Sequence, residues 1–273
     1  MPRILMCPPD FYGIEYEINP WMDVAVEADH ALAVEQWGAL QALLAGSGAE
    51  VAVQTPVPGL PDLVFTANAA LIYQGTAVLA RFKHAQRQGE TEHDRRWFEA
   101  NGFEVVDPPG DAAFEGAGDA LFCGDTLFAG YRMRSDAGGA QQIGALLGVR
   151  VLPLELVSSR YYHLDTCFCP LSPSEAVYYP GAFDDYGRRV LAEYVPHLIP
   201  VESNEAEAFA CNAVVVGHRV FTNTGCPRLH EALASRSYEP TATPLSEFVK
   251  AGGSAKCLSL RLDGEEAASW RAP

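Results

Sequence analysis

The chain has 273 residues, of which 48% are hydrophobic and 20% are charged, and its formal net charge is −16. This size and apolar content allow a large buried core in one or two domains. So much negative charge repels phosphate backbones, which excludes nucleic acid as an expected partner.

The first residues lead directly into an apolar run that is too short for a signal peptide, and no stretch reaches transmembrane length. Without a secretion signal, the seven cysteines are expected to be reduced thiols of a cytoplasmic protein with no membrane contact. Cys167 and Cys169 form a C-x-C pair, but no second pair has zinc-binding spacing. We therefore predict neither a metal site nor a cofactor.

The N-terminal part reads as strand, loop, helix and strand. Residues 3–7 form an apolar run, and prolines with glycine break it directly afterwards. Apolar residues then recur at helical spacing from His30 to Leu44, and Gly46 is expected to end that helix. A short strand follows at 51–53, and the prolines of 56–62 indicate a loop.

Four hairpins then recur, and a polar residue opens each one. The hairpins are expected at 69–80, 120–130, 166–179 and 213–222, from their turn chemistry. The opening residues are Asn68, Asp119, Asp165 and Asn212, in steps of 51, 46 and 47, and Cys257 continues the series 45 residues later.

A helix and a short strand follow each hairpin. The helices are expected at 92–101, 138–147, 184–194 and 228–235, with strands such as 103–106 and 149–152 behind them. The unit is strand–strand–helix–strand, and a fifth copy is split, with 257–262 as a strand that pairs near residues 3–7. Regular polar openings favour such a radial α/β repeat over ordinary α/β alternation.

In a radial array the hairpin starts converge on the axis, so the five opening residues are expected to meet there. His163 lies two residues before Asp165, and this spacing puts both on one side of an extended segment. Glu115 lies in a glycine-rich loop, and Asp62 lies six residues before Asn68.

A thiol, a histidine and carboxylates together suit nucleophilic attack by Cys257, with His163 as proton carrier. Taken singly, each has a structural explanation: a buried cysteine, a turn-forming aspartate, a structural histidine. Several carboxylates near one thiol suppress its ionisation, which is tolerable when the substrate is a cation. A guanidinium, which binds carboxylates in a bidentate manner, is such a cation.

At these residues the chain resembles the pentein guanidine-modifying enzymes: arginine deiminases, dimethylarginine dimethylaminohydrolases and amidinotransferases. The resemblance is greatest to the arginine dihydrolases and extends over nearly the whole chain. It rests on five segments: Ile18–Met22, Pro61–Ala69, Phe114–Leu121, Tyr162–Leu171 and Gly252–Leu258.

The resemblance implies a five-bladed pentein α/β propeller of ββαβ repeats around a central active site, with residues 1–273 as a single catalytic domain. It implies that Cys257 is the nucleophile, that His163 is general acid and base, and that Glu115 supports it. It further implies that Asp62 and Asp165 hold the guanidinium and that Arg87 and Arg134 bind the substrate carboxylate. Without the resemblance, both arginines would be read as exposed and solubilising.

Asn68 and Asn19 match the dihydrolase pattern, whereas deiminases and many dimethylarginine hydrolases carry another residue at position 68. The expected reaction is therefore arginine to ornithine, carbon dioxide and two ammonia. The alternatives are hydrolysis of arginine or a methylated arginine to citrulline and, less favoured, amidino transfer.

The large dihydrolases also carry a C-terminal ornithine-cyclising domain, which this sequence lacks, so cyclisation to proline is not expected. The expected partner is a small guanidinium substrate, and an oligomer is left open.

The rival from another class is a non-catalytic pentein binding module, since this fold alone does not give function. Such a module is expected to lack the central thiol and histidine, and this sequence has both.

Overall fold

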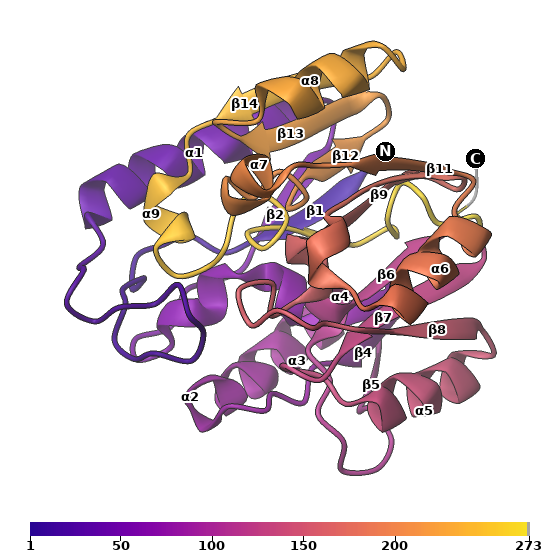
Figure 1. Cartoon of the computed structure of the whole chain (residues 1–273). Helices are drawn as coiled ribbons and strands as arrows, with labels where there is room; N and C mark the ends of the chain where they lie inside the picture. Colours follow the sequence, from indigo (N-terminus) through magenta and orange to yellow (C-terminus); the bar gives the residue numbers. More distant parts are fainter. Residues whose placement is uncertain (272–273) are drawn as a thin grey trace.

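The computed structural model describes residues 1–271, which form five three-stranded sheets and the helices around them (Figure 1). Each sheet has the same plan, in which a central strand pairs antiparallel with one neighbour and parallel with the other. The strand orders are β3-β4-β5, β6-β7-β8, β9-β10-β11, β12-β13-β14 and β15-β1-β2. The predicted strand–strand–helix–strand unit is therefore present five times.

The strands are β1 Arg3–Met6, β2 Glu50–Val53, β3 Ala70–Tyr73, β4 Thr76–Leu79, β5 Glu104–Val106, β6 Ala120–Cys123, β7 Thr126–Tyr131, β8 Arg150–Glu155, β9 Phe168–Ser172, β10 Glu175–Tyr178, β11 His197–Pro200, β12 Val214–Val216, β13 Arg219–Asn223, β14 Glu239–Thr243 and β15 Leu260–Arg261. The α-helices are α1 His30–Gly46, α2 Ala85–Gln88, α3 Glu90–Ala100, α4 Gly116–Asp119, α5 Ala137–Leu147, α6 Asp185–Tyr194, α7 Ser203–Glu207, α8 Pro227–Ala234 and α9 Ser246–Val249. Four 3₁₀ helices are η1 Pro61–Val64, η2 Thr66–Asn68, η3 Leu164–Thr166 and η4 Pro180–Ala182.

The four expected hairpins and the helix after each are confirmed, with helix bounds within two residues. The turn between β3 and β4 shows why its residues predicted a hairpin. Gln74 and Gly75 both have positive φ, 47° and 87°, which is the backbone of a tight two-residue hairpin turn. The first long helix differs slightly from the prediction, since Gly46 lies inside α1 and Ser47 caps it.

The fifth sheet joins the two ends of the described chain, as the split repeat predicts. Ile4 pairs with Arg261 and Leu5 with Leu260, and β2 lies parallel to β1 on its other side. The prediction of a strand over 257–262 is wrong for most of its length, because β15 is only Leu260–Arg261. Residues 255–258 curl into a turn in which Leu258 donates to the carbonyl of Ser254 at 3.1 Å.

The polar residues that open the hairpins also differ in local structure from the prediction. Asn68 ends η2, Asp119 ends α4 and Asp165 lies in η3, so each sits in a single helical turn just before its hairpin. Such a turn points the backbone donors and the side chain of one residue toward the same region. The sequence reading missed these turns, as well as α2, α7 and α9.

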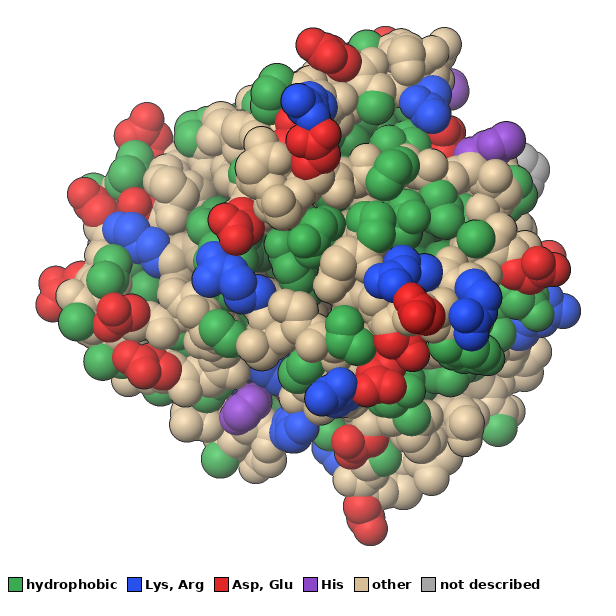
Figure 2. Space-filling model, viewed as in Figure 1, with side chains coloured by type: hydrophobic (Ala, Val, Ile, Leu, Met, Phe, Trp, Pro, Cys, Tyr) green, Lys and Arg blue, Asp and Glu red, His purple; other side chains and the backbone are tan. Residues whose placement is uncertain are grey.

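In Figure 1 the longer helices α1, α3, α5, α6 and α8 lie toward the outside of the molecule and α4 lies near its middle. The largest apolar cluster runs between β9, β10 and the segments that follow them, and a second cluster packs α1 and α9 around Leu258. In Figure 2, apolar side chains gather near the middle of the same face, with charged side chains around them. Within residues 1–271, no helix has both the length and the apolar character that crossing a membrane requires.

Candidate active site

The candidate site residues lie in the interior of the protein. All of the predicted residues except Asn19 are at most 3% exposed, namely Cys257, His163, Glu115, Asp62, Asn68, Arg87, Arg134 and Asp165. Polar groups at this depth are costly unless they have partners, so their contacts define the site.

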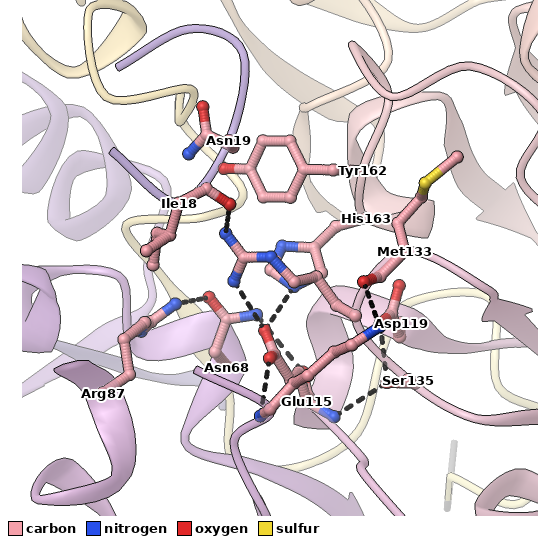
Figure 3. A network of polar contacts seen from close by, with 12 residues as sticks. Ile18, Asn19, Asn68, Arg87, Glu115, Asp119, Met133, Ser135, Tyr162 and His163 are labelled. Carbon is pink, nitrogen blue, oxygen red and sulfur yellow. Dashed lines mark hydrogen bonds and ion pairs between the residues drawn. The ribbon is translucent and has the colours of Figure 1, made fainter. Parts of the chain in front are cut away.

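His163 and Glu115 form the shortest contact among the predicted catalytic residues. The distance from His163 Nε2 to Glu115 Oε2 is 2.7 Å, and Arg134 Nη1 donates to the same oxygen at 3.0 Å (Figure 3). Burial raises the pKa of Glu115, but the charges of Arg134 and His163 outweigh it and hold that pKa well below its usual range. The resulting buried carboxylate orients the imidazole.

A second hydrogen-bonded chain fixes the backbone on both sides of that contact. The amide of Glu115 donates to Ser135 Oγ at 2.9 Å, and Ser135 Oγ donates to Asp119 Oδ2 at 2.6 Å. The other oxygen of Asp119 accepts from the amide of Leu164, the residue after His163, at 3.0 Å. Asp119 thereby connects the loop that carries the acid to the segment that carries the histidine.

The glycines around Glu115 allow this close packing. Gly116 has φ +60°, and a Cβ there would lie 2.7 Å from the carbonyl oxygen of Asn68. A Cβ on Gly118 would lie 2.1 Å from Asn68 Nδ2, so a side chain at either position displaces Asn68.

Cys257 lies between an acidic and an amide partner. Its Sγ is 3.5 Å from Asp165 Oδ2, and Asn212 Nδ2 donates to Sγ at 3.1 Å. Burial, together with the charge of Asp165, raises the pKa of the Cys257 thiol well above its ordinary value. The neutral thiol of Cys257 therefore donates to the carboxylate of Asp165, as expected for carboxylates packed around a cysteine.

Asp62 and Asp165 each have one buried oxygen without a hydrogen-bond partner among residues 1–271, in both cases Oδ1. Burial raises the pKa of Asp165 to about 7 and raises that of Asp62. Buried, incompletely satisfied carboxylates require an explanation, and a cationic ligand provides one.

Arg87 and Arg134 are ion-paired inside the protein rather than exposed. Arg87 makes two hydrogen bonds to Glu90, at 2.9 and 2.8 Å, and a third to Asn68 Oδ1 at 2.9 Å. Arg134 donates to Glu115 and, at 3.0 Å, to the carbonyl of Ile18. The charge of Arg134 lowers the pKa of Glu115, whereas the charge of Arg87 only opposes the effect of burial on Glu90, whose pKa is raised to about 8.

Asn19 lies in the irregular loop before α1 and joins it to the segment before Cys257. Its Nδ2 donates to the carbonyl of Ala251 at 3.0 Å, and its Oδ1 accepts from the amide of Trp21 at 2.9 Å. Trp21 in turn donates to the carbonyl of Arg160. In the described structure Asn19 therefore holds a loop beside the site.

Of the five opening residues, Asn212, Asp165 and Cys257 contact one another, whereas Asn68 bonds to Glu115 and Asp119 to Leu164. Asn212 contacts Cys257 and the backbone of Asp165, Asn68 Nδ2 donates to the carbonyl of Glu115, and Ala67 donates to the carbonyl of Cys257. The sequence reading placed Asn212 and Asp119 at the axis but assigned them no role. Glu90 was not predicted as a site residue. Its position three residues after Arg87 could have indicated the ion pair, because oppositely charged residues at this spacing interact in helical segments. Among the described residues, no three His, Cys, Asp or Glu side chains are arranged to hold a metal ion.

Comparison with known proteins identifies the family to which this chain belongs. A family model described as "N,N dimethylarginine dimethylhydrolase, eukaryotic" matches residues 17–262. The chain belongs to this family of guanidine-modifying enzymes. It is 48% identical, over 95% of its length, to the bifunctional arginine dihydrolase/ornithine cyclodeaminase ArgZ of Synechocystis, and it spans 37% of the length of that protein. It is 38% identical to the N(G),N(G)-dimethylarginine dimethylaminohydrolase of Mycobacterium tuberculosis, over 95% of this chain and 85% of that one.

Solved structures of the family share the fold. The N-terminal domain of ArgZ, as a variant bound to its substrate, superposes with a TM-score of 0.94 at 46% identity, covering 98% of this chain and 100% of that domain. The resemblance to the pentein guanidine-modifying enzymes is therefore confirmed, and so is the α/β class of the fold.

Proposed function

We propose that this chain is an arginine dihydrolase, which converts L-arginine and two waters to L-ornithine, carbon dioxide and two ammonia. The proposal is carried by the buried Cys257 thiol, which contacts Asp165; this carboxylate keeps one oxygen without a partner among the described residues, and so does Asp62. The buried His163–Glu115 hydrogen bond provides the proton carrier. The N-terminal domain of ArgZ, a protein named an arginine dihydrolase, is similar to nearly all of this chain. This similarity supports arginine as the substrate.

In the proposed mechanism, the guanidinium of arginine pairs with Asp62 and Asp165, whose Oδ1 atoms have no partner among the described residues. The proton of Cys257 passes to His163, and the thiolate attacks the guanidinium carbon. His163 then gives this proton to the departing nitrogen, which leaves as ammonia and leaves a covalent thiouronium. Glu115, at 2.7 Å, stabilises the imidazolium during the transfer.

His163 next takes a proton from water, which attacks the thiouronium and expels Cys257, and the product is bound citrulline. A second attack by Cys257 on the ureido carbon releases the second ammonia. Water then frees the cysteine, and the carbamate that results loses carbon dioxide to give ornithine. The alternative is release after the first cycle, from arginine or from a methylated arginine, which gives citrulline.

Further parts of the proposal concern the whole chain. The five sheets are proposed to be the blades of a five-bladed pentein propeller whose axis passes through the site, and residues 1–273 to be one catalytic domain that works in the cytoplasm. Arg87 and Arg134 are proposed to exchange part of their internal contacts for the substrate carboxylate. A non-catalytic binding module fits less well, because such a protein has no use for a buried thiol and a buried histidine–glutamate hydrogen bond.

Product analysis tests the function. The purified chain is incubated with L-arginine and, separately, with asymmetric dimethylarginine, and ornithine, citrulline and dimethylamine are separated and quantified. We expect ornithine from arginine, with two ammonia per ornithine, and no product from Cys257→Ser. Citrulline as the final product would replace the dihydrolase assignment with the deiminase or dimethylarginine alternative. Absence of turnover with either substrate, together with tight binding of arginine, would favour the binding module.

A further inference from the structure

Asn212 makes three hydrogen bonds with Lys256 and Cys257, more than its position at the start of a hairpin requires. Its side chain is fully buried, and its backbone carbonyl accepts from the amide of Lys256 at 3.2 Å. Its Oδ1 accepts from the amide of Cys257 at 3.1 Å, and its Nδ2 donates to Cys257 Sγ, also at 3.1 Å. One residue therefore holds both the backbone and the sulfur of the proposed nucleophile.

The orientation of this amide is determined by the chemistry of its partners. The backbone N–H of Cys257 can only donate, so the amide oxygen must face it. The carbonyl of Asp165, 3.1 Å from Nδ2, can only accept, so the NH2 group must face Asp165 and Cys257 Sγ. Asn212 consequently presents an N–H to the sulfur and not a lone pair.

The two partners of the sulfur favour opposite protonation states. The carboxylate of Asp165 accepts from the thiol, which stabilises the neutral S–H form. The N–H of Asn212 stabilises the thiolate, because a hydrogen bond to the charged form favours that form. When a cationic group pairs with Asp165, its influence on the thiol falls, whereas the donor from Asn212 stays in place.

From this geometry we propose that Asn212 is a further catalytic residue, whose side-chain N–H stabilises the thiolate of Cys257 during attack and during its expulsion from the covalent intermediate. The inference rests on the proposed role of Cys257 as nucleophile. The effect of Asn212 on the pKa of the Cys257 thiol has the required sign, since this hydrogen bond lowers it.

Asn212→Asp removes the donor to the sulfur but also adds a negative charge beside it, so the neutral pair Asn212→Ser and Asn212→Ala isolates the effect of the donor. The carboxylate can still accept from the amide of Cys257, but it cannot donate to the sulfur. A matched control exists in Asn223, which is also buried, accepts from the amide of Leu245 at 3.0 Å and donates to the carbonyl of Ala208 at 3.1 Å. Asn223→Asp therefore makes the same chemical change at a buried amide away from the thiol.

The test is the alkylation rate of Cys257 by iodoacetamide in the substrate-free protein, followed by mass spectrometry of the peptide that contains Cys257. Below the pKa of the thiol this rate is proportional to the thiolate fraction, so one unit of pKa changes it tenfold. We expect Asn212→Asp to slow the alkylation of Cys257 at pH 8 by at least about tenfold, and Asn212→Ala to slow it in the same direction. Asn223→Asp is expected to stay within about threefold of wild type.

Equal rates in wild type and Asn212→Asp, or equal slowing in Asn223→Asp, would overturn the proposal. Circular dichroism and the thermal midpoint establish that each variant is folded, and Asn212→Ser provides a second, smaller donor if the aspartate variant fails to fold. A folded Asn212→Ser variant is expected to alkylate faster than Asn212→Ala, and the reverse order would also contradict the role. Because the assay reads the thiol without turnover, its outcome is separate from that of the product analysis above.

Discussion

Arg87 donates a hydrogen bond of 2.9 Å to the side-chain oxygen of Asn68. This contact orients the amide, so that Nδ2 of Asn68 faces the site and donates to the carbonyl of Glu115 at 3.2 Å. An amide nitrogen has two N–H groups, and the contact with Glu115 uses one of them. The other is available to a ligand that binds beside Glu115 and His163.

The first prediction is that Asn68→Ser stops the reaction at citrulline. The substitution removes the N–H that can hold a bound ureido group for a second attack, while the thiol, the histidine and the carboxylates stay in place. Amino-acid products of wild type and variant are separated at equal conversion of arginine. Ornithine from the variant in the wild-type proportion would show that Asn68 does not have this role.

The second prediction is that Cys257→Ser abolishes turnover but keeps arginine binding, because a hydroxyl is a far weaker nucleophile than a thiolate. Turnover is followed by ammonia release, and binding by calorimetry. Cys167→Ser is the control: this buried thiol donates to the carbonyl of Leu164, so its loss is expected to lower stability and leave the chemistry intact. Residual activity of Cys257→Ser above a few per cent would remove this cysteine from the mechanism.

The third prediction concerns the charge of the substrate. Asp62→Asn is expected to weaken arginine binding by roughly 2–5 kcal/mol, as observed when one member of a buried charge pair is removed. Citrulline has nearly the same shape without the charge, and its binding is expected to change much less. Both affinities are measured by calorimetry in the Cys257→Ser background, to prevent turnover. An equal loss for the two ligands would mean that Asp62 acts through shape and not through charge.

The fourth prediction is a pH dependence of stability from Asp94, on α3. Its Oδ1 accepts from Gln54 at 2.9 Å, its Oδ2 has no partner among the described residues, and burial raises its pKa from 3.8 to about 6. The native state therefore binds this proton more tightly than the unfolded chain. The stability that the proton on Asp94 contributes is complete below about pH 4 and is lost as the pH rises through about 6.

Asp94→Asn has no proton to lose, so its stability relative to wild type is expected to improve by about 2–3 kcal/mol between pH 4 and pH 8. Urea unfolding at both pH values measures the difference. Asp125→Asn, at an exposed turn, is the control and is expected to follow wild type at both. A difference between Asp94→Asn and wild type that does not change with pH would show that Asp94 stays ionised in the native protein.

The positions that converge on the site could be predicted because they recur in register, but their local structure could not. Asn68, Asp119 and Asp165 follow one another at similar steps, and the hairpin after each has clear turn residues. The turn at Cys257 was mistaken for a strand because residues 255–262 are buried all round, and an apolar run without an exposed face does not reveal its period.

The ion pairs of the site could not be predicted from the sequence either. Arg134 and Glu115 lie 19 positions apart and meet only because their segments are adjacent in the fold. The expectation for both arginines came from family resemblance, and nothing in their neighbours along the chain indicates that they are buried. The repeat predicts that Asn212 and Cys257 meet, but it does not show that one amide bonds both the backbone N–H and the sulfur of the cysteine.

The pairing of β15 with β1 sets the order in which the protein can become active while it is being synthesised. Residue 4 leaves the ribosome more than 250 residues before its partner, residue 261. His163 and Glu115 are synthesised long before that time, whereas the segment after Cys257 joins β1 only when Leu262 donates to the carbonyl of Arg3. Until then β1 presents one unpaired edge, and open strand edges pair readily with other chains. Slow or interrupted translation of the last sheet therefore exposes this edge to a neighbouring copy of the nascent protein.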